Sequence, residues 1–192
     1  MKRPAVFIDR DGTINEQLGY INHASRFLIF PFVAEAVKLL NEGGLLAIVV
    51  SNQSGIGRGY YPEELVLELH GRLNEHLAAK GARLDNIYYC PHHPHAELEE
   101  FREECNCRKP RTGLIDRALE DFDIDMEHSY VVGDRYVDMD FARRAGLKGV
   151  LVRTGYGLGE LQYNAEGNPD PAYTAEDLLD AVKWILEQER NP

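Results

Sequence analysis

The chain has 192 residues, of which 44% are hydrophobic and 28% charged, and its formal net charge is -11 at pH 7. This length suits one domain with a sizeable core, and the acidic balance argues against nucleic-acid binding, which relies on clustered Lys and Arg. The first apolar run ends at Asp9, so it is too short for a signal peptide or a membrane span. We therefore expect a single domain over residues 1–192, in the cytoplasm, with no nucleic-acid or membrane partner.

Short aliphatic runs alternate with segments of helical spacing along the chain. Continuously apolar runs, typical of strands buried on both faces, occur at 5–9, 45–52, 87–90, 130–134 and 149–154. Helical spacing covers 31–44, 62–81, 112–122 and 137–146, and a last helix is expected over about 175–189. The segment 155–173 is rich in Gly and Pro and is predicted to be a loop. The alternation predicts an α/β fold, a three-layer Rossmann-like parallel sheet with helices on both faces.

Acidic residues stand where the first and fourth predicted strands end. Asp9 closes the first strand, Asp11 lies in the turn opened by Gly12, and Asp134 follows the fourth strand. Ligands of parallel sheets bind beyond the carboxyl ends of the strands, and like charges this close together require a cation. Carboxylates without nearby His or Cys favour Mg2+. The alternative is a plain turn, because Asp and Gly are common turn residues.

Two further polar residues are candidates for binding a phosphate group at the same edge. Ser51 ends the second predicted strand with a hydroxyl donor, and Lys109 precedes the helix that leads to the fourth strand. Each side chain can hold a phosphate oxygen. The alternatives are that Ser51 only caps a turn and that Lys109 is only solvated.

All three cysteines of the chain fall between positions 90 and 107. With no export signal and an odd number of thiols, a disulfide framework is not expected. Four residues, Cys90, His92, Cys105 and Cys107, are instead suited to a closed tetrahedral zinc site with a structural role. The alternative is three thiols that merely pack, although the intervening segment is polar. We expect His93 and His95 to be solvated.

Five separated stretches resemble one family of phosphatases. "DRDGT", Ser51, Lys109 and "GDRYVD" are similar, in this order, to the four motifs of the haloacid dehalogenase (HAD) superfamily. More closely, "FIDRDGTIN", "SNQSGIGRGYY", "YYCPHHP", "CNCRKP" and "VVGDRYVDM" resemble the heptose bisphosphate phosphatases over roughly residues 5–155. The resemblance implies a HAD-like fold with a zinc-binding loop at 90–107. The lack of a large cap insertion favours a monomer.

The resemblance also implies a reaction, removal of the 7-phosphate from D-glycero-D-manno-heptose 1,7-bisphosphate during synthesis of lipopolysaccharide precursors. Asp9 would attack phosphorus and form an aspartyl-phosphate, and Asp11 would act as general acid and base. Mg2+ would bind Asp9, the main-chain carbonyl of Asp11 and Asp134. Ser51 and Lys109 would steady the phosphoryl group.

The same resemblance implies a larger set of substrate-binding residues. Besides Asp9, Asp11, Ser51 and Lys109, the set contains Gln17, Leu18, Gly19, Tyr20, Asn52, Gln53, Ser54, Arg58, Arg108 and Arg135. Arg58 and Arg108 are the candidates for a second phosphate. We expect Asp138 to support the metal site without being a direct ligand.

Two alternative functions stay open at this point. The histidinol-phosphate phosphatases have the same catalytic motifs and a similar zinc loop, so those motifs do not distinguish them. A receiver-like phospho-acceptor module also combines acidic residues with a Ser or Thr and a Lys at strand ends. Its acceptor, however, lies on a middle strand of the sequence, whereas the candidate here ends the first.

Overall fold

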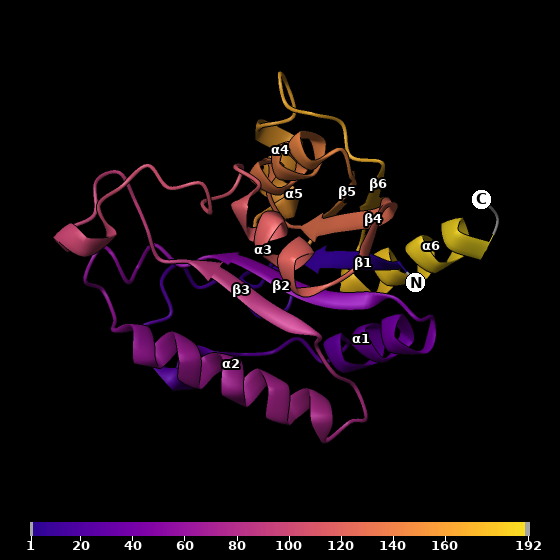
Figure 1. Cartoon of the computed structure of the whole chain (residues 1–192), viewed down its shortest axis with the longest axis horizontal. Helices are drawn as coiled ribbons and strands as arrows, with labels where there is room; N and C mark the ends of the chain where they lie inside the picture. The colour runs from indigo at the N-terminus through magenta and orange to yellow at the C-terminus, as the bar shows by residue number, and fades with distance from the viewer. Residues whose placement is uncertain (1, 191–192) are drawn as a thin grey trace.

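A computed structural model describes residues 2–190, which form a six-stranded parallel sheet with helices on both faces (Figure 1). The strands lie in the order β3-β2-β1-β4-β5-β6. Their bounds are Arg3–Ile8 (β1), Leu46–Asn52 (β2), Asn86–Cys90 (β3), Ile124–Gly133 (β4), Lys148–Val152 (β5) and Tyr173–Ala175 (β6). The five predicted strands and the predicted α/β class are confirmed.

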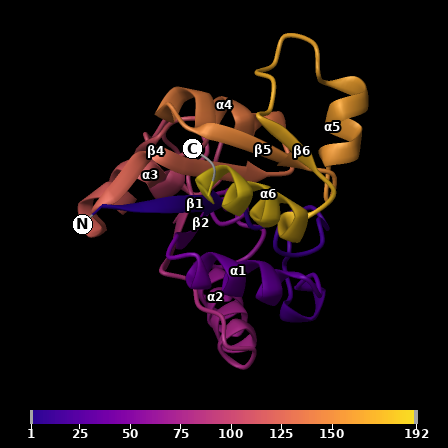
Figure 2. The same ribbon diagram turned by 90° about the vertical axis from the view of Figure 1, so that its right-hand side faces the viewer.

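Three helices cover one face of the sheet and two cover the other, as the two views show (Figures 1 and 2). The first group is α1 (Val33–Glu42), α2 (Glu63–Ala78) and α6 (Leu178–Arg190), and the second is α3 (Gly113–Asp121) and α4 (Tyr136–Ala145). A short helix α5 (Gly157–Tyr163) and two 3-10 turns, η1 (Ala24–Arg26) and η2 (Glu99–Phe101), lie in the connections.

Strand β1 shows why continuous apolar runs predicted strands between two helical layers. Val6 and Ile8 pack in the core with α1 and α6, whereas Ala5 and Phe7 pack on the opposite face with α3 and α4. All four side chains are fully buried. Since alternate side chains of a strand face opposite sides, a stretch buried on both faces, such as residues 5–8, is apolar at every position. Truncating Phe7 to Ala would cost about 3–5 kcal/mol.

The topology places the end of β1 at the point where the strand order reverses. The chain runs from β1 outward to β2 and β3, and then returns to β4 on the other side of β1. Open parallel sheets bind ligands in the crevice at such a switch point. Asp9 follows β1 and Asp134 follows β4, so the topology brings both to this crevice.

The expectation that 155–173 is a loop was wrong for part of the segment. Residues 157–163 form α5, and β6 begins at Tyr173, so the last helix starts at Leu178 instead of near 175. One glycine of the segment reflects tight packing, because a Cβ atom on Gly157 would lie only 1.8 Å from the carbonyl oxygen of Val152. Strand β6 has three residues, too few for its periodicity to be visible.

The connection between β3 and α3, residues 91–112, extends beyond the carboxyl ends of the strands (Figure 1). No separate cap domain covers this edge in the part of the chain that the structure describes, in agreement with the expected lack of a large cap insertion. Over residues 2–190, none of the helices has the length and hydropathy that crossing a membrane requires.

Candidate active site

The predicted catalytic residues meet in one small cavity at the carboxyl ends of β1, β2 and β4. The walls include Asp9, Asp11, Ser51, Lys109 and Asp134. Its volume is about 120 Å³, whereas a pocket that encloses a whole drug-sized ligand measures about 300–1,000 Å³. The cavity therefore suits a group of phosphate size, with the rest of a larger ligand outside its mouth.

The predicted substrate residues divide into two groups. Six of them, Gln17, Gly19, Tyr20, Asn52, Gln53 and Arg135, also line the cavity. The remaining four, Leu18, Ser54, Arg58 and Arg108, are not among its lining residues. Tyr61, Val137 and Asp138 complete the walls.

Lys109 is a buried cation that holds two of the acidic side chains. Its Nζ donates to Asp9 Oδ1 and to Asp138 Oδ1, each at 2.6 Å, and to the Val50 carbonyl oxygen at 3.0 Å. Burial lowers the pKa of Lys109, but the negative charges of Asp138 and Asp9 outweigh this effect and raise the pKa above its ordinary value. The ammonium group is therefore charged and fixed beside Asp9.

Asp134 occupies a narrow space in the backbone after β4. Its Oδ2 accepts a hydrogen bond from the Tyr156 N–H at 2.8 Å, whereas its buried Oδ1 has no partner among the described residues. A Cβ atom on Gly12 or Gly155 would lie 2.0 or 2.1 Å from Oδ2, and both glycines have positive φ. These two positions therefore require glycine so that the backbone can close around the carboxylate.

The carboxylates of Asp9, Asp134 and Asp138 place oxygen atoms within 4.8 Å of one another. Burial, followed by the charges of Asp9 and Asp138, raises the pKa of Asp134 to about 8, and burial raises the pKa of Asp9 to about 7. The single positive charge of Lys109 does not balance the negative charges of three carboxylates. Both oxygens of Asp138 are occupied, by Lys109 Nζ and the Arg135 N–H. Asp9 and Asp134 thus have the oxygen atoms that are free to bind a metal ion, and carboxylate oxygens suit Mg2+.

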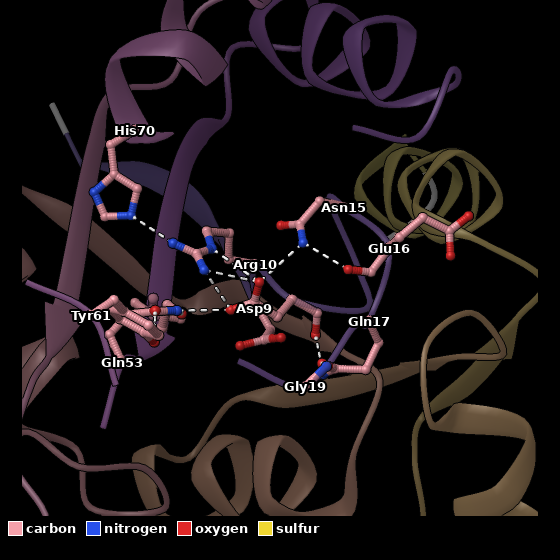
Figure 3. A network of polar contacts seen from close by, with 12 residues as sticks. Asp9, Arg10, Asn15, Glu16, Gln17, Gly19, Gln53, Tyr61 and His70 are labelled. Atoms are coloured by element: carbon pink, nitrogen blue, oxygen red, sulfur yellow. Dashed lines mark hydrogen bonds and ion pairs between the residues drawn. The ribbon is translucent and has the colours of Figure 1, made fainter. Parts of the chain in front are cut away.

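The Asp11 carboxylate is not part of this cluster and is held by three other side chains, Arg10, Asn15 and Gln53, which Figure 3 labels. Arg10 Nη2 donates to its oxygens at 2.9 and 2.8 Å, Asn15 Nδ2 to Oδ1 at 3.0 Å, and Gln53 Nε2 to Oδ2 at 2.7 Å. Burial raises the pKa of Asp11, but Arg10 and these hydrogen bonds lower it below the ordinary value. Arg10 is almost fully buried, with Nη1 3.4 Å from His70 Nε2.

Gln17 connects the turn after β1 to the mouth of the cavity. Its Nε2 donates to the main-chain carbonyl of Asp11 at 3.2 Å, and its Oε1 accepts from the Gly19 N–H at 3.0 Å. Tyr20, the next residue, is 41% exposed. The predicted segment 17–20 therefore borders the entrance, although the Leu18 side chain does not line it.

Asn52 determines where the main chain of Lys109 lies. Asn52 Oδ1 accepts from the Lys109 N–H at 3.0 Å, and Asn52 Nδ2 donates to the Lys109 carbonyl oxygen at 3.2 Å. This pair of bonds joins the end of β2 to the segment that follows the cysteines. Asn52 thus contributes to the site through its effect on Lys109.

The predicted zinc ligands Cys90, His92, Cys105 and Cys107 form one cluster with ligand atoms within 4.8 Å. Cys105 Sγ lies 3.4 Å from both other sulfurs, which excludes a disulfide, since that bond is about 2.05 Å long. Two sulfurs on one tetrahedral zinc ion are about 3.8 Å apart, given Zn–S bonds of about 2.3 Å. His92 Nε2 lies 3.2 Å from Glu103 Oε1, so the other ring nitrogen, Nδ1, faces the thiols.

The two arginines outside the cavity both contact the cysteine-containing loop. Arg58 Nη2 lies 2.8 Å from His93 Nε2, and Arg108 Nη1 donates to the His92 carbonyl oxygen at 3.3 Å. Burial and the positive charges of Arg108 and Arg58 lower the pKa of His93. The expectation that His93 is simply solvated was therefore wrong, whereas His95 is exposed as predicted. The error arose because Arg58, the contact partner of His93, is distant from it in the sequence.

Helix α5 is connected to the site through Arg135. Arg135 Nε lies 3.3 Å from Glu160 Oε1, and its guanidinium carbon lies 5.3 Å from the centre of the Tyr156 ring. Glu160 is 8% exposed. Tyr156 also donates its N–H to Asp134. The segment 155–173, which was expected to be a loop, therefore positions both Arg135 and Asp134.

Sequence reasoning missed four residues of the polar network around Asp11. Arg10 and Asn15 lie within the motif "DRDGTIN", where their polar character beside buried positions was an available signal. His70 on α2 and Tyr61 before it join the network only through the tertiary fold (Figure 3). No local pattern distinguishes these two from ordinary core residues.

Comparison with known proteins places the chain in a family. Residues 106–181 match the HAD-hydrolase-like family model. The D-glycero-D-manno-heptose-1,7-bisphosphate 7-phosphatase of Thermosynechococcus vestitus is 44% identical over 189 residues, covering 96% of each chain. The D-glycero-beta-D-manno-heptose-1,7-bisphosphate 7-phosphatase of Escherichia coli K12 is 45% identical over 189 residues, covering 97% of this chain and 96% of that one.

The fold is also similar to that of a solved structure. The crystal structure of D,D-heptose 1,7-bisphosphate phosphatase from B. bronchiseptica, complexed with magnesium and phosphate, matches with a TM-score of 0.86 and 27% sequence identity. The match covers 96% of this chain and 99% of that chain. Together with the two relatives, this likeness confirms the resemblance seen in the motifs. The chain belongs to the D-glycero-D-manno-heptose 1,7-bisphosphate 7-phosphatase family of the haloacid dehalogenase superfamily.

Proposed function

We propose that the protein hydrolyses the 7-phosphate of D-glycero-D-manno-heptose 1,7-bisphosphate, a reaction that supplies heptose for lipopolysaccharide. The observation that carries the proposal is the surroundings of Asp9 at the switch point of the sheet. Its carboxylate contacts the Lys109 ammonium at 2.6 Å and shares a cluster with Asp134, which has an unpartnered oxygen. A nucleophile, a cation for phosphoryl oxygens and a metal ligand thus lie together.

The reaction proceeds in two steps at Asp9. In the first step a carboxylate oxygen of Asp9 forms a bond to phosphorus, the bond from phosphorus to O7 of the sugar breaks, and Asp11 gives a proton to the leaving oxygen. In the second step water attacks phosphorus, Asp11 takes a proton from the water, and the bond to Asp9 breaks. The products are heptose 1-phosphate and inorganic phosphate.

The low pKa of Asp11 in the free protein is compatible with this role. The charge and hydrogen bonds of Arg10, with the hydrogen bonds from Asn15 and Gln53, favour its ionised form when the cavity holds no anion. A phosphate group beside Asp11 adds negative charge, which raises the pKa of a carboxyl group. Asp11 therefore gains its proton as the substrate binds, and Lys109 and Ser51 donate hydrogen bonds to the phosphoryl oxygens.

The donor set in the cavity fits a magnesium ion. Asp9, Asp134 and the main-chain carbonyl of Asp11 would hold it, and the unpartnered, buried Oδ1 of Asp134 is the observation that supports this assignment. When bound, the ion offsets the repulsion between the Asp9 carboxylate and an anionic substrate. The B. bronchiseptica relative was crystallised with magnesium and phosphate.

Arg58 and Arg108 are suited to the second phosphate of the substrate. Both guanidinium groups lie at the loop containing His92 and His93, outside the small cavity. The cavity of about 120 Å³ leaves the sugar and its other phosphate at the mouth. Arg forms bidentate contacts with phosphate, so two such groups at the loop that leads into Lys109 favour a bisphosphate.

The cysteine cluster is proposed to hold a structural zinc ion. Three sulfurs and His92 Nδ1 supply four ligands, which leaves no open position for a reacting group. The contact between His92 Nε2 and Glu103 is the kind of interaction that orients a metal-bound imidazole. The ion would fix the loop that leads from Cys107 into Arg108 and Lys109.

The comparisons also favour this function over the two alternatives. Both relatives described above are heptose 1,7-bisphosphate 7-phosphatases. Histidinol phosphate has a single phosphate and a positively charged amine, for which the two arginines Arg58 and Arg108 are unsuitable. A receiver-like module is not favoured, because the candidate nucleophile ends β1 and family membership covers nearly the whole chain.

The test is phosphate release from purified protein with Mg2+, measured on both anomers of heptose 1,7-bisphosphate and on histidinol phosphate. Phosphorus NMR of the product identifies which ester is cleaved. We expect preferential loss of the 7-phosphate, with histidinol phosphate a poor substrate. Equal efficiency on histidinol phosphate, or loss of the 1-phosphate, would refute the proposal.

A further inference from the structure

The side chain of Gln53 makes contacts that a simple substrate-binding residue would not make. It is 2% exposed, and its amide group contacts the side chains of Asp11, Ser51 and Tyr61 around the cavity. Nε2 donates to Asp11 Oδ2 at 2.7 Å and to Ser51 Oγ at 2.8 Å. These two bonds use both hydrogens of the amide nitrogen.

The third contact determines which way the amide points. The Tyr61 hydroxyl donates to Gln53 Oε1 at 3.0 Å (Figure 3). If the amide were flipped, its oxygen would face the Asp11 carboxylate, and two acceptors would be in contact. The Tyr61 ring is held in turn, because a Cβ atom on Gly55 would lie 2.3 Å from its Cζ. The orientation of the amide is therefore determined on both sides.

We propose that Gln53 is a positioning residue for the general acid and base Asp11, and that Tyr61 fixes the orientation of its amide. This inference rests on the proposed function, in which Asp11 protonates the leaving oxygen. Gln53 holds Asp11 Oδ2 at a set position relative to Ser51, whose hydroxyl contacts the phosphoryl group in the proposed reaction. Because Ser51 Oγ accepts from Gln53, its own hydrogen is left to donate to a phosphoryl oxygen.

The proposal has a kinetic signature that a general loss of structure does not share. An alkyl phosphate has a poor leaving group and needs a well-placed general acid, whereas p-nitrophenyl phosphate has a good leaving group and does not. kcat/KM reports the steps up to release of the leaving group. A displaced Asp11 should therefore lower kcat/KM for the alkyl ester more than for the aryl ester.

Two variants test it, with one matched control. Tyr61→Phe retains the ring and removes only the donor, and Gln53→Glu retains the shape and removes both hydrogens. Tyr60→Phe is the control, since Tyr60 is 52% exposed and its hydroxyl has no hydrogen bond within residues 2–190. Each protein is assayed on heptose 1,7-bisphosphate and on p-nitrophenyl phosphate, with circular dichroism as the check on folding.

We expect the ratio of alkyl to aryl kcat/KM to fall roughly threefold to tenfold for Tyr61→Phe, as for loss of one neutral hydrogen bond. For Gln53→Glu it should fall by about a hundredfold, within the range of general acid catalysis. Tyr60→Phe should leave the ratio unchanged. A ratio that stays at the wild-type value in folded Tyr61→Phe and Gln53→Glu proteins would overturn the inference.

Failure of the proposed function gives a different result. Wild-type protein that hydrolyses p-nitrophenyl phosphate but not the heptose bisphosphate would refute the substrate assignment. The ratio would then be measured with the alkyl phosphate that the wild type cleaves best, and the same two outcomes would decide the role of Gln53. Wild-type protein inactive on every phosphate ester would overturn both proposals together.

Discussion

Replacing Asp134 by Asn should stabilise the metal-free protein and abolish its response to magnesium. The Asp134 side chain is buried, its Oδ1 has no partner in the described structure, and its oxygens lie within 4.8 Å of those of Asp9 and Asp138. An amide retains an oxygen to accept from the Tyr156 N–H. Its NH2 group can donate to a neighbouring carboxylate, so that a repulsion is replaced by a hydrogen bond.

The size of the effect follows from the cost of the unpartnered oxygen. A buried polar group without a hydrogen bond costs about 1–3 kcal/mol. In a protein of this length, 1 kcal/mol shifts the midpoint of thermal unfolding by about 2–4 °C. We therefore expect Asp134→Asn to raise the Tm of the metal-free protein by roughly 2–12 °C.

The gain in stability should increase with pH. The pKa of Asp134 in the folded protein is raised from 3.8 to about 8, so the folded state binds this proton more tightly than the unfolded chain. The stability that this carboxyl contributes is fully present below about pH 4 and is lost as the pH rises toward 8. The Asn variant has no such loss. Its advantage over the wild type should be larger at about pH 8.5 than at about pH 5.5.

The assay is thermal unfolding followed by circular dichroism, with and without added magnesium and without a chelator, so that any bound zinc is retained. Magnesium should raise the Tm of the wild type but not that of Asp134→Asn. The control is Asp140→Asn on helix α4, which begins two residues after Asp134, and Asp140 pairs there with Arg144 at 2.8 Å. It should retain the magnesium response without gaining stability. An Asp134→Asn protein that is less stable without metal, or still stabilised by magnesium, would refute the reasoning.

Three further predictions concern catalysis, zinc and the second phosphate. Asp9→Asn should abolish turnover, because an amide is not a nucleophile toward phosphorus, and Asp11→Asn should lower kcat by about two to four orders of magnitude, in phosphate-release assays. Purified protein should contain about one zinc per chain by elemental analysis, and Cys105→Ser should lose zinc and weaken bisphosphate binding. Arg58→Ala or Arg108→Ala should raise KM for the bisphosphate about tenfold or more, with little effect on monophosphates.

Each of these predictions has a clear contrary result. Near wild-type activity of Asp9→Asn with magnesium would exclude the covalent mechanism. Absence of zinc from protein purified without chelators would exclude the structural zinc site. Equal changes in KM for bisphosphate and monophosphate substrates would show that Arg58 and Arg108 do not contact the second phosphate.

The amino-acid sequence by itself determined the type of fold and the chemistry of the two clusters. Continuous apolar runs predicted strands buried on both faces, because β1 packs against helices on either side. Asp9, Asp134 and the cysteines could be identified because their chemical types stand at strand ends or in one short segment. Motifs of this kind are local in the sequence, so they can be recognised without knowledge of the tertiary structure.

Only the tertiary structure decided which side chains hold the catalytic groups in place. Lys109 contacts Asp9 across 100 positions of the chain, and Gln53 contacts Asp11 across 42. The link of Glu160 to Arg135 likewise depends on the packing of α5 against β5. Hydrophobic periodicity records whether a residue is buried, but it does not record which distant polar atom it meets. That partner is set by the order of the strands and the geometry of their connections.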